Sequence, residues 1–348
     1  MHPDSPSPTG GTEIRWAEIG GERYAVRDLT PDDTSAMLAL HRRVFGADSD
    51  TSWFDWKYQA GGAVGVAMWR GDEMVAHGAG LPRPLWHRGV RTTGMQVGDV
   101  MTAPEYRGIL TRQGPFFHTT KMLYESKLGP APKIAIGYGF PSERHMRLGA
   151  ALRLGWDRGP IHGLSWPAAD PAQPAPALRW WRWEPLDAAA PGFDAAIQGA
   201  WDAMRPEAAA MGLTLGERSP AYLRWRFCDR PDKAYRFFAL RRPWSRTVRG
   251  IAVTEIPAAG RPMMWLDWVG PLRLMALATL ACRREAGRAG ASGMTAWATP
   301  AVREHLAATG LSDVTETARL GVPVASDVQA DAVAGFRWWF MGGDTDFL

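Results

Sequence analysis

Apolar and polar positions in the first half of the chain follow two different periods, which predict both strands and helices. Residues 23–29 alternate as a half-buried strand does, whereas apolar residues within 31–45 recur every three or four positions, as on one helix face. Gly71 and Asp72 separate two apolar runs and indicate a hairpin turn. The predicted elements are a strand, two helices, three strands, a helix, a strand and a helix, over residues 23–29, 31–45, 53–58, 64–70, 74–81, 93–101, 112–127, 133–138 and 141–149. A last strand is expected after them.

The second half of the chain repeats this order of elements. Three landmarks recur in the same order, at offsets of 169, 168 and 159 residues: 53–58 with 222–227, Asp99 with Asp267, and Pro141 with Pro300. A repeat of this length predicts two copies of one structural unit. Each copy is predicted to be an α/β (α+β) domain with a mixed, mostly antiparallel central sheet and helices on both faces.

The length of 348 residues agrees with two domains of ordinary size. Residues 166–178 are rich in Pro and Ala and predict a linker between the copies. We therefore expect a disordered tail over 1–12, an N-terminal domain over 13–165, the linker, and a C-terminal domain over 179–348.

Composition excludes several classes of protein. An apolar fraction of 46% and a charged fraction of 22% are ordinary for a globular chain, and they exclude disordered and collagen-like proteins. Two cysteines are too few for a disulfide scaffold, and no apolar run is long enough to cross a membrane. We expect a cytoplasmic protein without a signal peptide. A net charge of +4 without a basic block disfavours nucleic acid as a partner.

One segment carries a motif with a chemical meaning. Residues 98–108 read GDVMTAPEYRG, and a further helix starts after Pro141 and ends near Gly149. Both resemble elements of the GNAT superfamily of acetyl-CoA-dependent N-acyltransferases, and the order of elements is similar too. The resemblance covers residues 20–165 by motif and the second half through the repeat. It implies a tandem GNAT protein that takes acetyl-CoA or another acyl-CoA as substrate and passes the acyl group to an amine.

The resemblance also implies which residues bind the acyl-CoA. In this family a strand edge pairs with the pantetheine arm, and a loop before a helix presents backbone N–H groups and arginines to the pyrophosphate. The loop 107–112 is about two residues shorter than in the family and lacks its later glycines. The positions implied here are Val100, Met101, Thr102, Arg107, Gly108, Ile109, Leu110, Thr111, Arg112 and Ser142. The second copy has Gly270-Pro271-Leu272-Arg273 in place of this loop, and we expect it not to bind CoA.

Asp99, His145 and Tyr138 are the candidate catalytic residues. The tyrosine that protonates the leaving thiolate in the family corresponds to Met146, so His145, Tyr138 or water has to supply that proton. Asp99 lies where relatives carry acidic residues that contact the amine. The alternative interpretation is a salt-bridged structural aspartate, which the equivalent Asp267 supports.

We therefore expect an acyltransferase whose acceptor, a small-molecule or sugar-like amine, binds between the two copies beside an aromatic wall. The alternatives are a Fem-like aminoacyl-tRNA-dependent transferase and a non-catalytic binding protein with the same fold. No metal-binding motif is present, and the sequence does not determine the oligomeric state. For Asp344 and Asp346 near the end of the sequence, a solvent-exposed position is favoured over one in the cleft.

Overall fold

The computed structural model describes residues 13–46, 49–131, 133–256, 260–323, 333 and 335–348. The tail predicted for residues 1–12 lies outside the described residues. Among the described residues, no helix is both long and apolar enough to span a bilayer.

The first half of the chain contains the predicted elements, with longer strands around the motif. β4 and β5 run well beyond their predicted ends because they continue as one long hairpin that turns at Arg88 and Gly89. The elements are β1 (Ile14–Ile19), β2 (Glu22–Asp28), η1 (Pro31–Asp33), α1 (Thr34–Phe45), α2 (Thr51–Phe54), η2 (Asp55–Ala60), β3 (Val64–Arg70), β4 (Glu73–His87), β5 (Val90–Thr102), η3 (Pro104–Tyr106), α3 (Pro115–Lys127), β6 (Ile136–Gly139), α4 (Glu143–Ala151) and β7 (Gly155–Pro167).

The second half repeats this order, with an additional strand, β9, between two of its helices, and adds a final strand and turn. Its elements are η4 (Pro176–Leu178), β8 (Arg182–Pro185), α5 (Phe193–Ala210), β9 (Leu213–Gly216), α6 (Pro220–Leu223), η5 (Arg224–Cys228), β10 (Tyr235–Arg241), β11 (Val248–Glu255), β12 (Met263–Val269), η6 (Leu272–Leu274), α7 (Met275–Arg288), β13 (Gly293–Ala298), α8 (Pro300–Leu306), β14 (Asp313–Pro323), β15 (Arg337–Trp339) and η7 (Gly342–Asp344).

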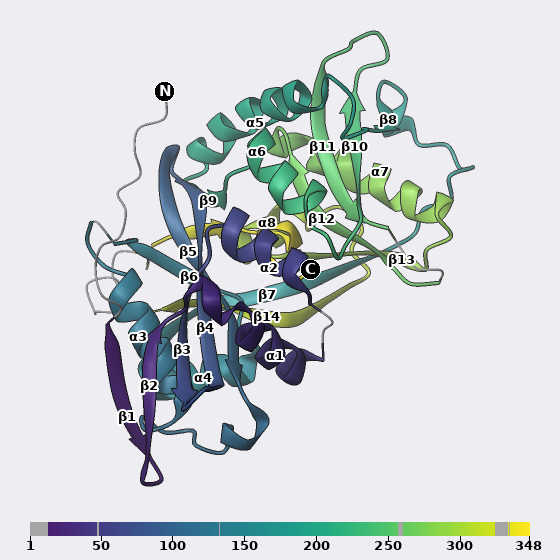
Figure 1. Cartoon of the computed structure of the whole chain (residues 1–348). Coiled ribbons are helices and arrows are strands. Elements are labelled where there is room, and N and C mark those ends of the chain that lie inside the picture. Colours follow the sequence, from purple (N-terminus) through teal and green to yellow (C-terminus); the bar gives the residue numbers. More distant parts are fainter. Residues whose placement is uncertain (1–12, 47–48, 132, 257–259, 324–332, 334) are drawn as a thin grey trace.

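The two copies share one continuous sheet, with the first copy at the lower left of Figure 1 and the second at the upper right. The strand order is β1-β2-β3-β4-β5-β6-β14-β7-β13-β12-β11-β10-β8. Along this path, β5 with β6 and β12 with β13 are parallel pairs, and the other pairs are antiparallel. This confirms the predicted mixed sheet with helices on both faces.

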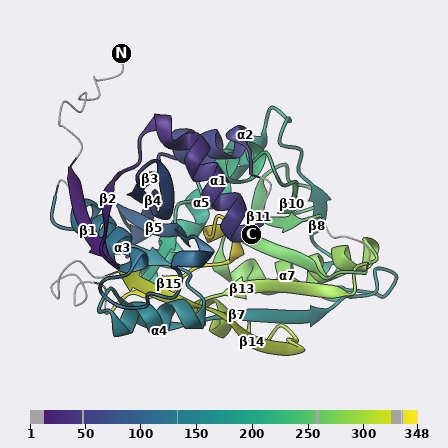
Figure 2. The same ribbon diagram turned by 60° about the horizontal axis from the view of Figure 1, so that its bottom comes forward.

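The copies exchange strands where they meet. β14 belongs to the second copy by sequence but lies between β6 and β7 of the first, and β7 in turn pairs with β13 of the second. Figure 2 shows β14, β7 and β13 side by side. Trp166 belongs to β7 and packs in the core of the second copy. The domain border predicted after residue 165 therefore falls inside a strand that both copies use.

Equivalent tryptophans of the repeat meet at the contact between the copies. The rings of Trp56 and Trp225 stack with their centroids 5.1 Å apart and their planes 10° apart. Trp56 Nε1 donates to the carbonyl oxygen of Trp225 at 2.6 Å, and Trp225 Nε1 donates to that of Trp56 at 3.0 Å. Each tryptophan is the second residue of a π-helical turn, η2 or η5, which follows a short α-helix in both copies. The contact between the two tryptophans is thus reciprocal.

Candidate active site

A cavity of about 600 Å³ opens in the first copy where β5 and β6 diverge. The last paired residues of the two strands are Val97 and Gly139. Beyond them, Gly98, Asp99 and Val100 on β5 line one wall and the chain from Phe140 to Ser142 lines the opposite wall. Parallel strands that part in this way leave backbone N–H and C=O groups of β5 available to a ligand.

A β-bulge turns the Asp99 side chain into this cavity. The register between β4 and β5 shifts between His77 and Ala79, opposite Asp99, whose φ is 44°. Aspartate tolerates this left-handed conformation better than most residues do. The Asp99 carbonyl oxygen accepts a hydrogen bond at 3.0 Å from Nδ1 of His77, a fully buried side chain whose pKa burial lowers. A neutral histidine on β4 therefore stabilises the bulge by this hydrogen bond.

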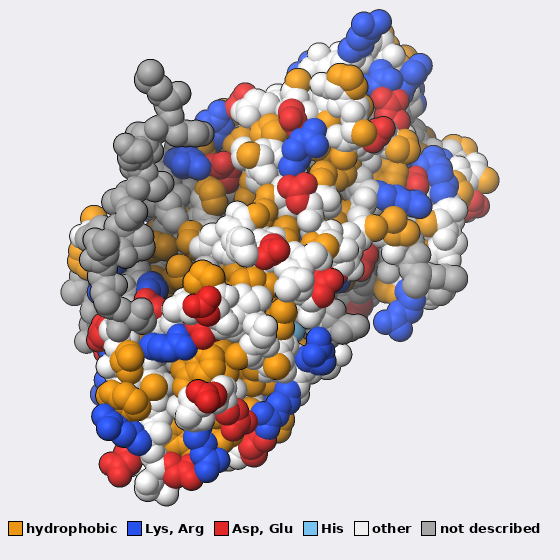
Figure 3. Space-filling view, viewed as in Figure 1, with side chains coloured by type: hydrophobic (Ala, Val, Ile, Leu, Met, Phe, Trp, Pro, Cys, Tyr) orange, Lys and Arg blue, Asp and Glu red, His pale blue; other side chains and the backbone are white. Residues whose placement is uncertain are grey.

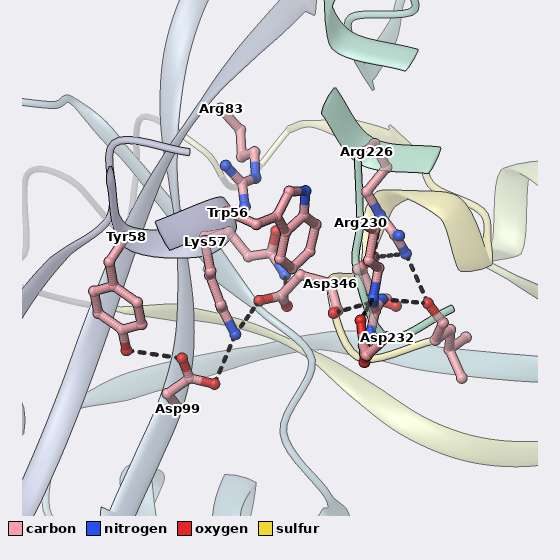
Figure 4. A network of polar contacts seen from close by, with 12 residues as sticks. Trp56, Lys57, Tyr58, Arg83, Asp99, Arg226, Arg230, Asp232 and Asp346 are labelled. Carbon is pink, nitrogen blue, oxygen red and sulfur yellow. Dashed lines mark hydrogen bonds and ion pairs between the residues drawn. The ribbon is translucent and has the colours of Figure 1, made fainter. Parts of the chain in front are cut away.

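The carboxylate of Asp99 belongs to a buried ionic network (Figure 4). Its Oδ1 accepts from Lys57 Nζ at 2.7 Å and its Oδ2 accepts from the Tyr58 hydroxyl at 2.8 Å. Lys57 also contacts Asp346 Oδ2 at 2.5 Å, and Gln96 Nε2 donates to Asp346 Oδ1 at 2.8 Å. Lys57 and Tyr58 come from the π-helical turn η2, whereas Asp346 comes from the last residues of the second copy. Both copies therefore build this network.

Burial and charge fix the protonation states of three of these groups. Burial works against the charge of Lys57, but Asp346 and Asp99 outweigh it and raise the pKa of the ammonium. Burial likewise opposes ionisation of Asp346, but Lys57 and Arg83 hold its pKa below the usual value. Burial, followed by the charge of Asp99, raises the pKa of Tyr58 well above its usual range. At neutral pH, Lys57 is a cation, Asp346 an anion and Tyr58 a neutral donor.

His145 lies on the opposite wall of the cavity, on α4. Its Nδ1 is 3.0 Å from the hydroxyl of Ser142, which caps the helix by accepting from the His145 backbone N–H. Partial burial, with Arg144 and Arg107 nearby, lowers the pKa of His145, so the imidazole is neutral at pH 7. Two of the residues predicted from the motif, Ser142 and His145, are therefore brought to the cavity together with Asp99.

Tyr138 points away from this cavity. Its ring packs in an aromatic cluster with Phe340, Trp338 and Phe140, with centroid distances from 5.0 to 6.0 Å. Successive side chains of a strand face opposite sides, so Gly139 reaches the cavity and Tyr138 does not. Burial raises the pKa of Tyr138 well above its usual range. This position gives the hydroxyl no contact with the cavity wall.

The remaining residues predicted to bind acyl-CoA lie at the end of β5 and in the loop after it. Val100 lines the cavity, whereas the Met101 side chain is buried in the core on the α1 side of the sheet. Arg107 Nε donates to the Thr102 carbonyl oxygen at 2.9 Å, which ties the loop to the strand end. Gly108, Leu110, Thr111 and Arg112 are exposed and Ile109 is half-buried, just before α3.

The last residues of the chain occupy the contact between the copies, so the predicted solvent-exposed position is wrong. Asp346 and Phe347 line the cavity, and Asp344 is buried. Asp344 Oδ2 accepts from Arg218 Nη2 at 2.6 Å, and Arg218 Nη2 also donates to Asp267 Oδ1 at 3.1 Å. Asp267 is thus a buried, ion-paired strand residue, and its pKa is raised by burial.

The second copy has no counterpart of the cavity among the described residues, because residues 341–345 fill that place. β12 and β13 pair only from Met263 to Met264 and then diverge, as β5 and β6 do. Met341 bridges to Ala298 on β13, and Gly343 lies against Asp267 on β12.

Sequence reasoning missed Lys57, Asp346 as a network member, and the histidine beside them. His41 on α1 lines the cavity, and its ring lies 4.6 Å from that of Trp53. One signal for Lys57 was present in the sequence. It is one of five lysines among 40 basic residues, and it lies inside the repeated 53–58 segment, where the second copy has Arg226. Among the described residues, no group of three or more His, Cys, Asp or Glu is placed to hold a metal.

The sequence of the first copy matches a known protein family. Residues 25–156 match the sequence model of a family described as "Acetyltransferase (GNAT) domain". No protein among the curated proteins matches the chain.

Many solved structures resemble the whole chain. A GCN5-related N-acetyltransferase from Kribbella flavida has 17% identity, covers 89% of this chain and 71% of its own, and gives a TM-score of 0.59. One from Anabaena variabilis ATCC 29413 has 14% identity over 91% and 74%, with a TM-score of 0.60. A tandem GNAT protein from the clavulanic acid biosynthesis pathway has 11% identity over 89% and 98%, with a TM-score of 0.50. At these identities the likeness shows a shared fold.

Proposed function

Residues 25–156 of this chain form a GNAT domain, and from this premise we propose that the protein is an acyl-CoA-dependent N-acyltransferase. It moves an acetyl or other acyl group to the amine of a small molecule that binds between the two copies. The observation that carries the proposal is the cavity at the divergence of β5 and β6. Asp99 lies on one wall of this cavity and His145 on the other.

The acyl-CoA would enter from the side of the loop after β5. The free edge of β5 from Val100 to Thr102 offers hydrogen bonds to the pantetheine amides, and Arg107 is tied to the end of that strand. The exposed loop with Arg107 and Arg112 leads directly to the N-terminus of α3, where a helix favours negative charge. These features support a binding site for the pyrophosphate of acyl-CoA at the mouth of the cavity.

The acceptor would lie on the side of the cavity that both copies build. The carboxylates of Asp99 and Asp346 lie there, with Lys57 between them, and the Asp99 carboxylate can attract an incoming ammonium. His41, Trp53 and Phe347 provide aromatic surface next to it. The amine thus binds with its nitrogen toward Asp99.

Starting from an ammonium, two protons have to leave the nitrogen and one has to reach the sulfur. The neutral imidazole of His145 accepts the first proton, directly or through water, and releases it to solvent, and the free amine attacks the thioester carbonyl. When the C–S bond breaks, His145 accepts the second proton from the nitrogen of the adduct and gives it to the thiolate, so that the imidazole returns to its starting state. Tyr138 has no place in this scheme because its ring lies in the aromatic cluster behind β6.

Calorimetric titration with acetyl-CoA tests the proposal. We expect binding by the wild type, and a loss on the order of 2–4 kcal/mol in R107A/R112A, because two charge-assisted contacts to phosphate are removed. R288A, which removes an exposed arginine of α7, is the control and should bind like the wild type. An affinity unchanged in R107A/R112A would show that the loop does not hold the pyrophosphate.

Thioester turnover over a panel of amines completes the test. Release of free CoA that depends on the added amine supports the proposal. Absence of acetyl-CoA binding at millimolar concentration would remove it, and aminoacyl-tRNA would then be the donor to try. Binding without turnover across the panel would instead identify a non-catalytic binding protein.

A further inference from the structure

The second copy contains a separate pocket of about 330 Å³ that the proposed reaction does not use. It lies between α5, the start of β11 and the residues before α7. Gly199 and Ala203, one turn apart on α5, leave its floor open. Val248 and Arg249 line it from β11, Pro271 and Leu274 from the segment before α7, and no lining residue comes from β13 or α8. The pocket therefore shares no lining residue with β13, from which β12 diverges.

Three arginines from three different segments converge on this pocket, and Asp and Glu are absent from its lining residues. Arg242 follows β10, Arg249 lies on β11 and Arg273 precedes α7. Lys and Arg side chains also gather over the end of the β10–β11 hairpin in Figure 3. Like charges placed together repel each other unless an anion joins them.

The partners of these arginines leave two positive charges uncompensated. Arg273 forms an ion pair with Glu207, which also accepts from the Arg273 backbone N–H. Arg242 stacks over the ring of Trp181 at 4.0 Å and donates to the Trp180 carbonyl oxygen. The Arg249 side chain is exposed and has no hydrogen bond or ion pair with any described residue.

The corresponding corner of the first copy is compensated instead. Glu105 follows Asp99 by six residues, just as Arg273 follows Asp267. In the first copy, Arg43 forms ion pairs with Glu73 and Glu105, so one cation meets two carboxylates. The second copy thus has an excess of arginine where the first has an excess of acid.

We propose that this arginine pocket binds a phosphate-bearing anion. Guanidinium groups present planar pairs of N–H donors that fit the oxygens of a phosphate, and three of them around one cavity surround such a group from several sides. The N-terminal end of α7 adds a favourable dipole. The volume agrees with a small ligand such as pyrophosphate or a nucleoside monophosphate.

Calorimetry with inorganic pyrophosphate at fixed ionic strength tests this site. All variants carry R107A/R112A, so that the loop of the first copy contributes nothing and the result does not depend on the proposed function. We expect binding in this background, a loss of at least about tenfold on adding R249A, and a larger loss on adding R249A and R273A together. R246A is the matched control, because Arg246 is exposed in the same hairpin outside the pocket lining, and it should leave the affinity unchanged.

Further arms of the titration separate the possible sources of the anion. AMP binding more tightly than pyrophosphate would indicate an organic phosphate, and the reverse would indicate an inorganic one. Malonate binding as tightly as pyrophosphate would overturn phosphate as the ligand. No pyrophosphate binding at millimolar concentration, or equal affinity in the R249A and R246A variants, would overturn the site. Urea unfolding of each variant verifies that it is folded, and R249A is informative even if R273A disturbs Glu207.

Discussion

At the residue scale, the charge of the cavity depends on one shared ammonium. Lys57 lies between Asp99 of its own copy and Asp346 of the other, and all three side chains are at least nine-tenths buried. Buried charges are costly unless each has a partner, and removing one partner leaves another charge uncompensated. Both copies therefore contribute charges that this network needs. Replacing any one of the three residues should destabilise the protein.

Replacing Asp99 by Asn tests the role of that carboxylate. We expect kcat/KM for the amine to fall about 10²–10³-fold, because the charge that orients the ammonium is lost, while acetyl-CoA affinity is retained. Steady-state kinetics and calorimetry give the two quantities. D28N is the control, since Asp28 pairs with Lys127 on the surface. An unchanged kcat/KM in D99N would assign Asp99 a structural role, as Asp267 has.

Asp344 should make stability depend on pH. Burial, together with the nearby Asp267, raises its pKa to about 6, against about 3.9 in the unfolded chain. The folded protein therefore binds this proton more tightly, and the resulting stability is complete below about pH 4 and is lost as the pH rises through 6. D344N removes this dependence. In urea unfolding at several pH values, the free energy of unfolding of D344N should rise relative to that of the wild type from pH 4 to 7. The same pH dependence in both proteins would contradict the assignment.

Part of the candidate site was visible in the sequence. Asp99 was identified from its place in the GNAT-like motif and because a carboxylate in an apolar strand needs a partner. Ser142 was identified from the resemblance of the helix after Pro141, and His145 because Met146 takes the place of the usual proton donor. Lys57 and Asp346 are 289 residues apart in the chain, and no local pattern reports a contact at that separation. Tyr138 was misplaced relative to the cavity because the facing of a strand depends on its register, which the sequence of four residues does not determine.

At the element scale, the exchanged strand β14 depends on glycines of β6. A Cβ built on Gly137 would lie 2.3 Å from Pro323 Cγ, at the end of β14. Gly139 pairs with Gly321 of the same strand. The close approach of β14 to β6 therefore requires that residue 137 has no side chain.

The substitution G137A should destabilise the protein by about 1–3 kcal/mol, because the new methyl group displaces Pro323 and with it the end of β14. G149A is the matched control. Gly149 lies inside α4, where a Cβ would meet nothing within 4 Å. Alanine there should therefore raise the free energy of unfolding by about 0.5–1 kcal/mol through its higher helix propensity. Urea denaturation compares the two, and a neutral G137A would show that β14 adjusts freely.

The elements themselves were predicted better than their pairing. Strand β3 coincides with its predicted range, and the repeated tryptophan segment forms a helical turn in both copies. The short strand β9 was not predicted, because four residues show no clear period and this strand forms through pairing with β15 and β4. The exchange of β7 and β14 depends on which strand edge each of them pairs with, and those edges are distant in the sequence. Hydrophobic periodicity within a strand does not report its pairing partner.

At the scale of the whole molecule, the exchange joins two copies into one folding unit. Neither half of the common sheet is complete without a strand from the other copy, and the last residues of the second copy line the cavity of the first. Figure 1 shows the C-terminal label in the middle of the molecule, between the two halves. The predicted linker over 166–178 therefore separates the copies along the sequence, while their strands pair in one sheet.

We expect the protein to unfold in urea in a single transition. Twelve of the 18 tryptophans follow residue 165, so fluorescence reports mainly on the second half, whereas far-ultraviolet circular dichroism reports on both. The two signals should give coincident curves if the copies unfold together. Two separated transitions, with most of the fluorescence change at one of them, would show that the copies are independent despite their common sheet.

The reciprocal stack of Trp56 and Trp225 has a consequence for inheritance. In a symmetric homodimer one codon serves both sides of such a contact, and a single mutation changes both at once. Here the two tryptophans are encoded 169 residues apart, so a mutation changes only one of them. The new residue must still stack on the ring of the unchanged tryptophan and hydrogen-bond to its carbonyl oxygen. Among descendants of this gene, the two positions should therefore change together or not at all.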